Sequence, residues 1–222
     1  MFKLPVIIVN FKTYKEATGK NALKLAKQIE KAQKEVGGSV VLAVEVQDIR
    51  MIADTVSLPV FAQHVDVCGF GAHTGGIIPE AVKDAGAVGT IVNHAEHEIS
   101  DEQIKATIKH CKKIGLFSVL CANTVNDVKR LKKFKPDVIA VEPPKLIGTG
   151  ISVSSAKPEV IKGSVKASGR IPLLCGAGIQ TGEDVFVSLK LGAKGVLLAS
   201  GVVKDKNPYK KMKELLLGLS AH

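Results

Sequence analysis

An alternation of short apolar segments with longer segments of helical spacing runs eight times along the chain. Almost every residue in these segments is apolar, without the alternation of apolar and polar residues, as strands covered on both faces by helices require. A polar or glycine-containing turn follows each of them, and then a segment with apolar residues at helical spacing. The predicted strands are residues 6–10, 40–44, 60–63, 89–92, 116–120, 138–141, 171–175 and 195–199.

Several of the intervening segments open with helix-start signals. Ser100 is followed three residues later by Gln103, which is the pattern of a capping box. Thr181 and Asp184 repeat this spacing, and Pro208 stands where the first turn of the last helix is expected. These start signals support the prediction that strands and helices alternate along the chain.

Eight such units in 222 residues predict a closed (β/α)8 barrel, a single domain spanning residues 1–222, with an open doubly wound sheet as the competing architecture. Hydrophobic residues make up 45% and charged residues 23%, proportions typical of globular proteins. No apolar run approaches the ~20 residues of a membrane helix. The first residues also lack the pattern of a secretory signal. We therefore expect a cytoplasmic protein without a membrane partner.

The distribution of charge and the spacing of the cysteines limit which ligands and partners the chain is expected to bind. Lysine and arginine outnumber acidic residues by 31 to 21, a net charge of +10 that could attract nucleic acid, a membrane surface or a small anion. Most lysines fall in helical patterns that predict solvated outer faces, and the absence of Trp leaves few rings for stacking on bases, so we expect no nucleic-acid partner. The four cysteines lack zinc-ligand spacing and are expected to be buried, reduced thiols.

Polar residues follow three of the predicted strands at the point where each strand ends. In a parallel β/α barrel the reacting groups lie at this rim, because eight loops gather there around a concave surface. Asn10 ends the first strand and Lys12 follows it on the same side, His94 follows the fourth strand and Glu142 follows the sixth. Taken singly, a histidine or glutamate at a strand end is more simply explained as a surface or capping group, and Lys12 as a solvated loop residue. Together they would supply a base, a proton donor and a fixed positive charge.

Turns of small residues follow the seventh and eighth predicted strands. Gly176 and Gly178 lie in the first turn, and Ala199 and Ser200 in the second. Such turns let backbone N–H groups and a helix N-terminus approach a phosphate, although tight turns that need glycine explain them equally well. A dinucleotide fits less well, because Thr181 stands where the third glycine of G-x-G-x-x-G would be. The second half of the chain therefore offers candidate anion sites.

Five short motifs extend this pattern and carry a specific resemblance. They are V-N-F-K at 9–12, G-A-H-T-G at 71–75, N-H-A-E at 93–96, V-E-P at 141–143 and I-G-T-G at 147–150. In this order, with the two turns, they resemble the triosephosphate isomerase family over essentially the whole chain. Ala95, Asn123 and Pro144-Lys145 depart from that family's usual serine, glutamate and Val-Trp.

The resemblance implies interconversion of dihydroxyacetone phosphate and glyceraldehyde 3-phosphate through an enediolate, with no cofactor and no metal. In family terms Glu142 would be the base, His94 a neutral electrophile and Lys12 the positive charge at the reacting oxygens. The trimmed helical segments resemble the archaeal branch of the family, which implies a homotetramer. The residues implied in substrate binding are Asn10, Lys12, Ile147, Gly148, Gly178, Ala199 and Ser200.

Two alternatives remain open. Another phosphate-binding (β/α)8 enzyme, a lyase or a synthase, would share the anion turns but need a different acid/base set at the strand ends. A basic protein that binds RNA would instead show a steep salt dependence of binding.

Overall fold

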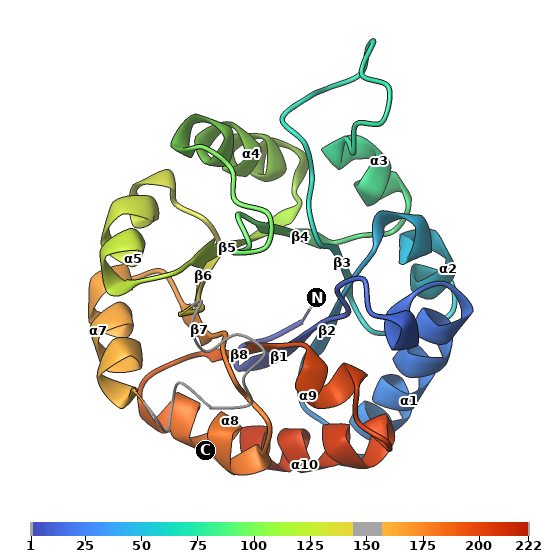
Figure 1. Ribbon diagram of the computed structural model, residues 1–222, viewed down its shortest axis with the longest axis vertical. Helices are drawn as coiled ribbons and strands as arrows, with labels where there is room; N and C mark the ends of the chain where they lie inside the picture. Colours follow the sequence, from blue (N-terminus) through green and yellow to red (C-terminus); the bar gives the residue numbers. More distant parts are fainter. Residues whose placement is uncertain (1, 144–156, 222) are drawn as a thin grey trace.

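The computed structural model describes residues 2–143 and 157–221, which include a closed barrel of eight parallel strands (Figure 1). The strands follow chain order around the barrel, so that β1 pairs with both β2 and β8. The predicted (β/α)8 barrel is therefore confirmed over an open doubly wound sheet. The strands are β1 (Val6–Asn10), β2 (Val40–Val44), β3 (Val60–Ala62), β4 (Gly89–Val92), β5 (Phe117–Ala122), β6 (Val138–Val141), β7 (Leu173–Cys175) and β8 (Gly195–Leu198).

Strands β1, β2, β4 and β6 have the predicted bounds, whereas β3, β7 and β8 are shorter than predicted. In β7 the first predicted residues are lost because Pro172 has no N–H to donate, although its carbonyl still accepts from the Ile139 N–H at 3.0 Å. In β8, Ala199 leaves the strand and becomes the N-cap of the next helix. Strand β5 extends further than predicted because Ala122 pairs with Val141 of β6.

Helices form an outer ring around the barrel (Figure 1). Both predicted capping boxes are present, Ser100 with Gln103 and Thr181 with Asp184, and Pro208 occupies the first turn of the last helix. None of the helices in the described ranges has the length and apolar character needed to cross a membrane. The α-helices are α1 (Lys20–Val36), α2 (Ile49–Ala53), α3 (Pro79–Asp84), α4 (Asp101–Ile114), α5 (Val125–Leu131), α7 (Pro158–Ser168), α8 (Gly182–Lys190), α9 (Ser200–Val203) and α10 (Pro208–Ser220), and the 3-10 helices are η1 (Lys15–Ala17), η2 (Val46–Asp48) and η3 (Lys132–Phe134).

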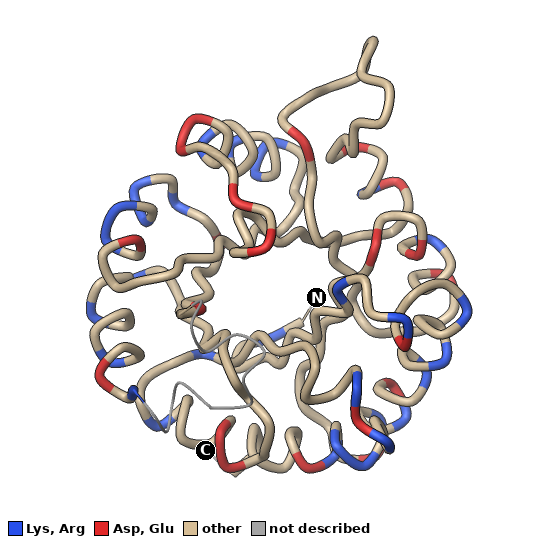
Figure 2. Tube along the Cα trace, in the orientation of Figure 1, with Lys and Arg blue, Asp and Glu red and all other residues tan. Residues whose placement is uncertain are grey.

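Lysine and arginine lie mainly on this helical ring (Figure 2). On α1, for example, Lys24, Lys27 and Lys31 are exposed, while Leu25 and Ile29 between them are buried. The lysine-rich segments are therefore solvated outer faces, as their spacing predicts.

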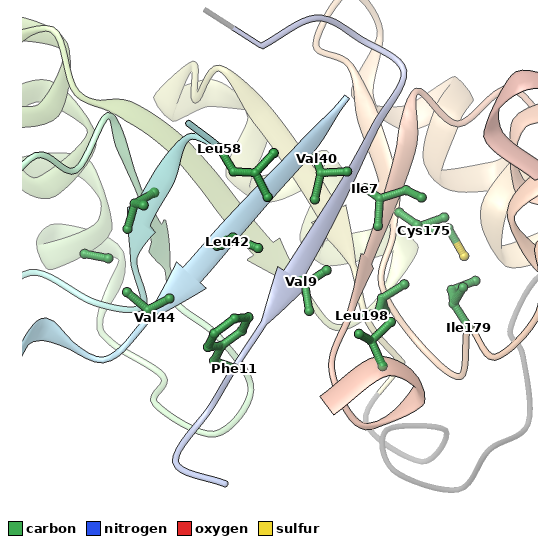
Figure 3. Packing of buried hydrophobic residues seen from close by; sticks show 14 of the residues in the cluster. Ile7, Val9, Phe11, Val40, Leu42, Val44, Leu58, Cys175, Ile179 and Leu198 are labelled. Carbon is green, nitrogen blue, oxygen red and sulfur yellow. The ribbon is translucent and has the colours of Figure 1, made fainter. Parts of the chain in front are cut away.

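Alternation along the strands divides the core into two layers. On β1, Ile7 and Val9 pack outward against the helices, in the layer that Figure 3 shows, whereas Val6 and Ile8 point into the barrel. Asn10 continues the inward series and so reaches the barrel interior at the carboxyl end of the strand. The strand period thus delivers a buried amide to the rim at which polar residues are expected.

Candidate active site

One cleft at the carboxyl ends of the strands brings together the predicted site residues that lie in the described ranges. It is formed by the loops after β1, β4, β6, β7 and β8. Ile147 and Gly148, which complete the predicted phosphate site, lie outside the described residues. The cleft is lined by Asn10, Lys12, Tyr14, His94, Glu142, Gly176, Ala177, Gly178, Ile179, Gln180, Leu197, Leu198, Ala199, Ser200 and Gly201.

Lys12 reaches this cleft through an unusual backbone turn. The strand ends at Asn10, and Lys12 has a left-handed φ of 49°, so the strand period does not place its side chain as predicted. The Asn10 side-chain oxygen stabilises the turn by accepting from the Lys12 N–H at 3.0 Å, and Gln63 Nε2 donates to the Lys12 carbonyl at the same distance. The lysine side chain is only 12% exposed, and its Nζ lies 2.7 Å from Glu96 Oε1. Lys12 is therefore not a solvated loop residue.

His94 sits in a second turn of this kind, directly after β4. Asn93 has a φ of 59°, and its side-chain oxygen fixes the turn by accepting from the Ile99 N–H at 3.0 Å. The His94 Nδ1 atom accepts from the Glu96 N–H at 3.1 Å, which leaves the ring proton on Nε2. Burial of the ring, and then the charge of Lys12, lower the pKa of His94. The imidazole is therefore neutral at pH 7 and presents an Nε2–H donor.

Glu142 follows β6 and is buried in the cleft. Burial raises the pKa of its carboxyl group to about 7, against the opposing effects of a hydrogen bond from the Cys121 thiol and the charge of Lys12. Its Oε2 atom lies 3.4 Å from His94 Nε2 and has no hydrogen-bond partner among the described residues. A carboxylate of raised pKa with one oxygen free for a proton suits general base catalysis near neutral pH.

The two predicted anion turns follow β7 and β8, which lie in the barrel between β6, the strand before Glu142, and β1, the strand before Lys12. Gly178 has a φ of 70°, a conformation that glycine adopts without strain. Ser200 begins the short helix α9, and the leading N–H groups of a helix have no partners within it. Gly178, Ala199 and Ser200 all line the cleft, so backbone donors are available for an anionic group in the same cleft as the titratable side chains.

Two contributors to the site have no assigned role from sequence alone. Glu96 contacts Lys12 through its carboxylate and His94 through its N–H, and its place two residues after the histidine in N-H-A-E is the available signal. Cys121 is the second, because its thiol bonds to Glu142 although no sequence spacing relates the two residues. All four cysteines are free, but Cys68 is partly exposed in the loop before α3, so the expectation that all four are buried is wrong there.

Within the described ranges, His, Cys, Asp and Glu side chains form no group of three or more suited to hold a metal ion. The titratable and cationic side chains that line the cleft include His94, Glu142 and Lys12.

Comparison with known proteins gives consistent results. A family model described as triosephosphate isomerase matches residues 5–215. The chain is 48% identical to the triosephosphate isomerase of Methanocaldococcus jannaschii over 215 residues, covering 95% of this chain and 98% of that protein. It is 46% identical to the enzyme of the same name from Saccharolobus solfataricus over 217 residues, covering 96% of each. The crystal structure of triosephosphate isomerase from Bartonella henselae shares the fold, with a TM-score of 0.75 and 18% identity over 98% of this chain and 99% of that one.

Proposed function

The chain belongs to the triosephosphate isomerase family and interconverts dihydroxyacetone phosphate and D-glyceraldehyde 3-phosphate, and we propose that Glu142, His94 and Lys12 carry out this reaction. The observation that carries the proposal is the meeting of three segments in one cleft. Glu142 Oε2 lies 3.4 Å from His94 Nε2, and Lys12 lines the same cleft.

Glu142 is the base in this proposal. It removes a proton from the carbon next to the carbonyl group, and the electron pair left behind forms an enediolate. At the enediolate stage a proton also passes from the former hydroxyl oxygen to the former carbonyl oxygen. The same carboxyl group then returns a proton to the neighbouring carbon, so no proton is gained or lost overall. Its raised pKa supports this role, because a base that titrates near neutral pH both accepts and returns a proton readily.

His94 and Lys12 act on the oxygens. The neutral imidazole of His94 donates from Nε2 to the oxygen that gains charge as the enediolate forms. Lys12 supplies a fixed positive charge at the same oxygens, and Asn10 holds the Lys12 backbone through its side-chain oxygen. Donors that are already in position need no reorganisation when the charge develops, which lowers the barrier.

The phosphate group of the substrate binds at the turns after β7 and β8, on backbone N–H groups near Gly178, Ala199 and Ser200. Ile147 and Gly148 join this set by resemblance alone. The lyase or synthase alternative finds no support in the relatives described above, all of which are named triosephosphate isomerase.

We also propose self-association, with a homotetramer as the state implied by resemblance. The loop between β3 and α3 projects away from the barrel (Figure 1). It carries Phe70, which is 80% exposed, and Val67, which is 46% exposed. An exposed aromatic ring on a projecting loop supports contact with another subunit.

The test is a coupled assay that follows NADH oxidation by glycerol-phosphate dehydrogenase, with glyceraldehyde 3-phosphate as substrate. The wild-type protein should be active, and Glu142→Ala should reduce kcat at least ~10³-fold, which corresponds to ~4 kcal/mol of transition-state stabilisation. Glu102→Ala, at an exposed acid on α4, is the matched control and should retain wild-type activity. Near-normal turnover in Glu142→Ala would remove Glu142 from the mechanism.

A further inference from the structure

Gly176, the first residue after β7, lies against the side chain of Glu142. A Cβ atom at Gly176 would lie 2.3 Å from Glu142 Cγ, 3.0 Å from Cδ and 3.1 Å from Oε1. Carbon atoms in van der Waals contact are ~3.5–4.0 Å apart, so the Glu142 side chain occupies the space that any side chain at 176 would need.

Backbone conformation does not account for this glycine. Gly178, two residues further on, has a left-handed φ, but Gly176 does not. The three heavy atoms nearest to the position of a Gly176 Cβ all belong to Glu142. The requirement for glycine at 176 is therefore steric and comes from one side chain.

The backbone around Gly176 cannot move away easily. Its N–H donates to the Val141 carbonyl at 2.9 Å, and the neighbouring Cys175 is in register with Val141 in the β6–β7 ladder. Val141 directly precedes Glu142, so these contacts fix the backbone of Gly176 relative to the backbone of Glu142. A Cβ at 176 would have to be accommodated by rotation of the Glu142 side chain.

The hydrogen bonds of the Glu142 carboxyl group are too weak to fix its position. Its partner is the thiol of Cys121, and thiols are weak donors. The other oxygen, Oε2, has no partner among the described residues. The position of the carboxylate therefore depends on the space available to it more than on its hydrogen bonds.

We propose that Gly176 is a positioning residue for the catalytic base, and that its missing side chain creates the space that keeps the Glu142 carboxylate beside His94. This proposal rests on the role of Glu142 proposed above. A side chain at 176 would displace the carboxylate from its place 3.4 Å from His94 Nε2 and leave the remainder of the cleft in place.

Kinetics of Gly176→Ala test the functional part. We expect kcat to fall at least ~10²-fold, since misplacement by ~1 Å can have such an effect, while KM changes less than kcat. A carboxylate displaced towards water should also have a pKa closer to its ordinary value, so the acidic limb of the kcat/KM profile should move to lower pH. Gly163→Ala on α7, where the nearest heavy atom would lie 3.4 Å away, is the control and should match wild type. Wild-type kcat and pH profile in Gly176→Ala would overturn the proposal.

A double-mutant cycle tests the contact without reference to activity. Gly176→Ala should lower the urea midpoint of unfolding in the wild-type background, because Cβ and Glu142 Cγ cannot both be accommodated. In a Glu142→Ala background Cγ and the carboxyl group are absent, so the same substitution should have little effect. If Gly176→Ala prevents folding in wild type, Glu142→Ala should restore it. Equal losses in both backgrounds would show that glycine serves the backbone and would overturn the proposal. Full activity of Glu142→Ala alone would instead contradict only the proposed base.

Discussion

Lys12 and Glu96, 84 positions apart in the chain, meet at 2.7 Å between Nζ and Oε1. The two partners differ in environment, since the lysine side chain is 12% exposed and the glutamate side chain is 57% exposed. An exposed ion pair contributes little to stability, because water screens it. The ion pair instead orients the site: the Glu96 carboxylate holds the Lys12 ammonium group in the cleft, and the Glu96 N–H holds the ring of His94.

Removing this charge tests its proposed role. Lys12→Met should reduce kcat/KM by at least ~10²-fold, an expectation for a fixed charge at the developing enediolate. The far-UV circular dichroism spectrum should be unchanged. Lys105→Met, at an exposed position of α4, is the control and should keep normal kinetics. If Lys12→Met unfolds while Lys12→Arg behaves as wild type, the residue is structural.

Burial of Glu142 should have a measurable effect on stability. Its pKa rises from 4.5 to about 7 in the folded state, so the folded protein binds the proton more tightly than the unfolded chain does. Glu142 therefore destabilises the fold at pH values above about 7, and this effect fades as the pH falls towards 4.5. Glu142→Gln should increase the free energy of unfolding at pH 8 by ~3 kcal/mol and change it little at pH 4.5. Urea denaturation at both pH values measures this, and an equal effect at each would contradict it.

His94 should remain neutral and keep its proton on Nε2. The ring nitrogen Nδ1 accepts from a backbone N–H, which can only donate, and burial lowers the pKa. Nitrogen-15 NMR should show a protonated Nε2 and an unprotonated Nδ1 at pH 7, with the signal assigned by its loss in His94→Gln. That variant should lose ~10²-fold in kcat, the usual contribution of a positioned proton donor. Protonation at both nitrogens at pH 7 would exclude the neutral electrophile.

A negative charge at the second anion turn should repel the phosphate. Ser200→Glu should weaken competitive inhibition by inorganic phosphate at least ~10-fold, equivalent to ~1.4 kcal/mol. Gln28→Glu makes the same change in charge on the exposed face of α1 and should leave inhibition unaltered. Equal inhibition of both variants would place the phosphate elsewhere.

The projecting loop should contribute to assembly. Light scattering should give a mass near four times 23.5 kDa for the wild-type protein. Phe70→Ser should lower the mass, because it removes the most exposed of the large apolar side chains identified in the described residues. A wild-type monomer that stays active at every concentration would contradict the proposed tetramer.

The positions of Asn10, His94 and Glu142 at one rim could be predicted from sequence, because parallel strands in a barrel all end on the same side. The turn at Lys12 could not, since a left-handed lysine depends on the Asn10 and Gln63 contacts that stabilise it. The dependence of Gly176 on Glu142 was equally inaccessible. Periodicity shows which end of a strand a residue occupies, whereas close contacts between neighbouring strands depend on three-dimensional packing.

Pairing of β1 with β8 also determines when the protein can first work during its synthesis. Asn10 and Lys12 leave the ribosome first, but Ala199 and Ser200, which follow the neighbouring strand β8 and line the same cleft, come almost two hundred residues later. Contacts of such wide separation form late and slowly in folding. A nascent chain that lacks β8 has an open edge at β1 and lacks the part of the cleft lining that runs from Leu197 to Gly201. We therefore expect isomerase activity only from chains that have been synthesised past β8, and none from products truncated before it.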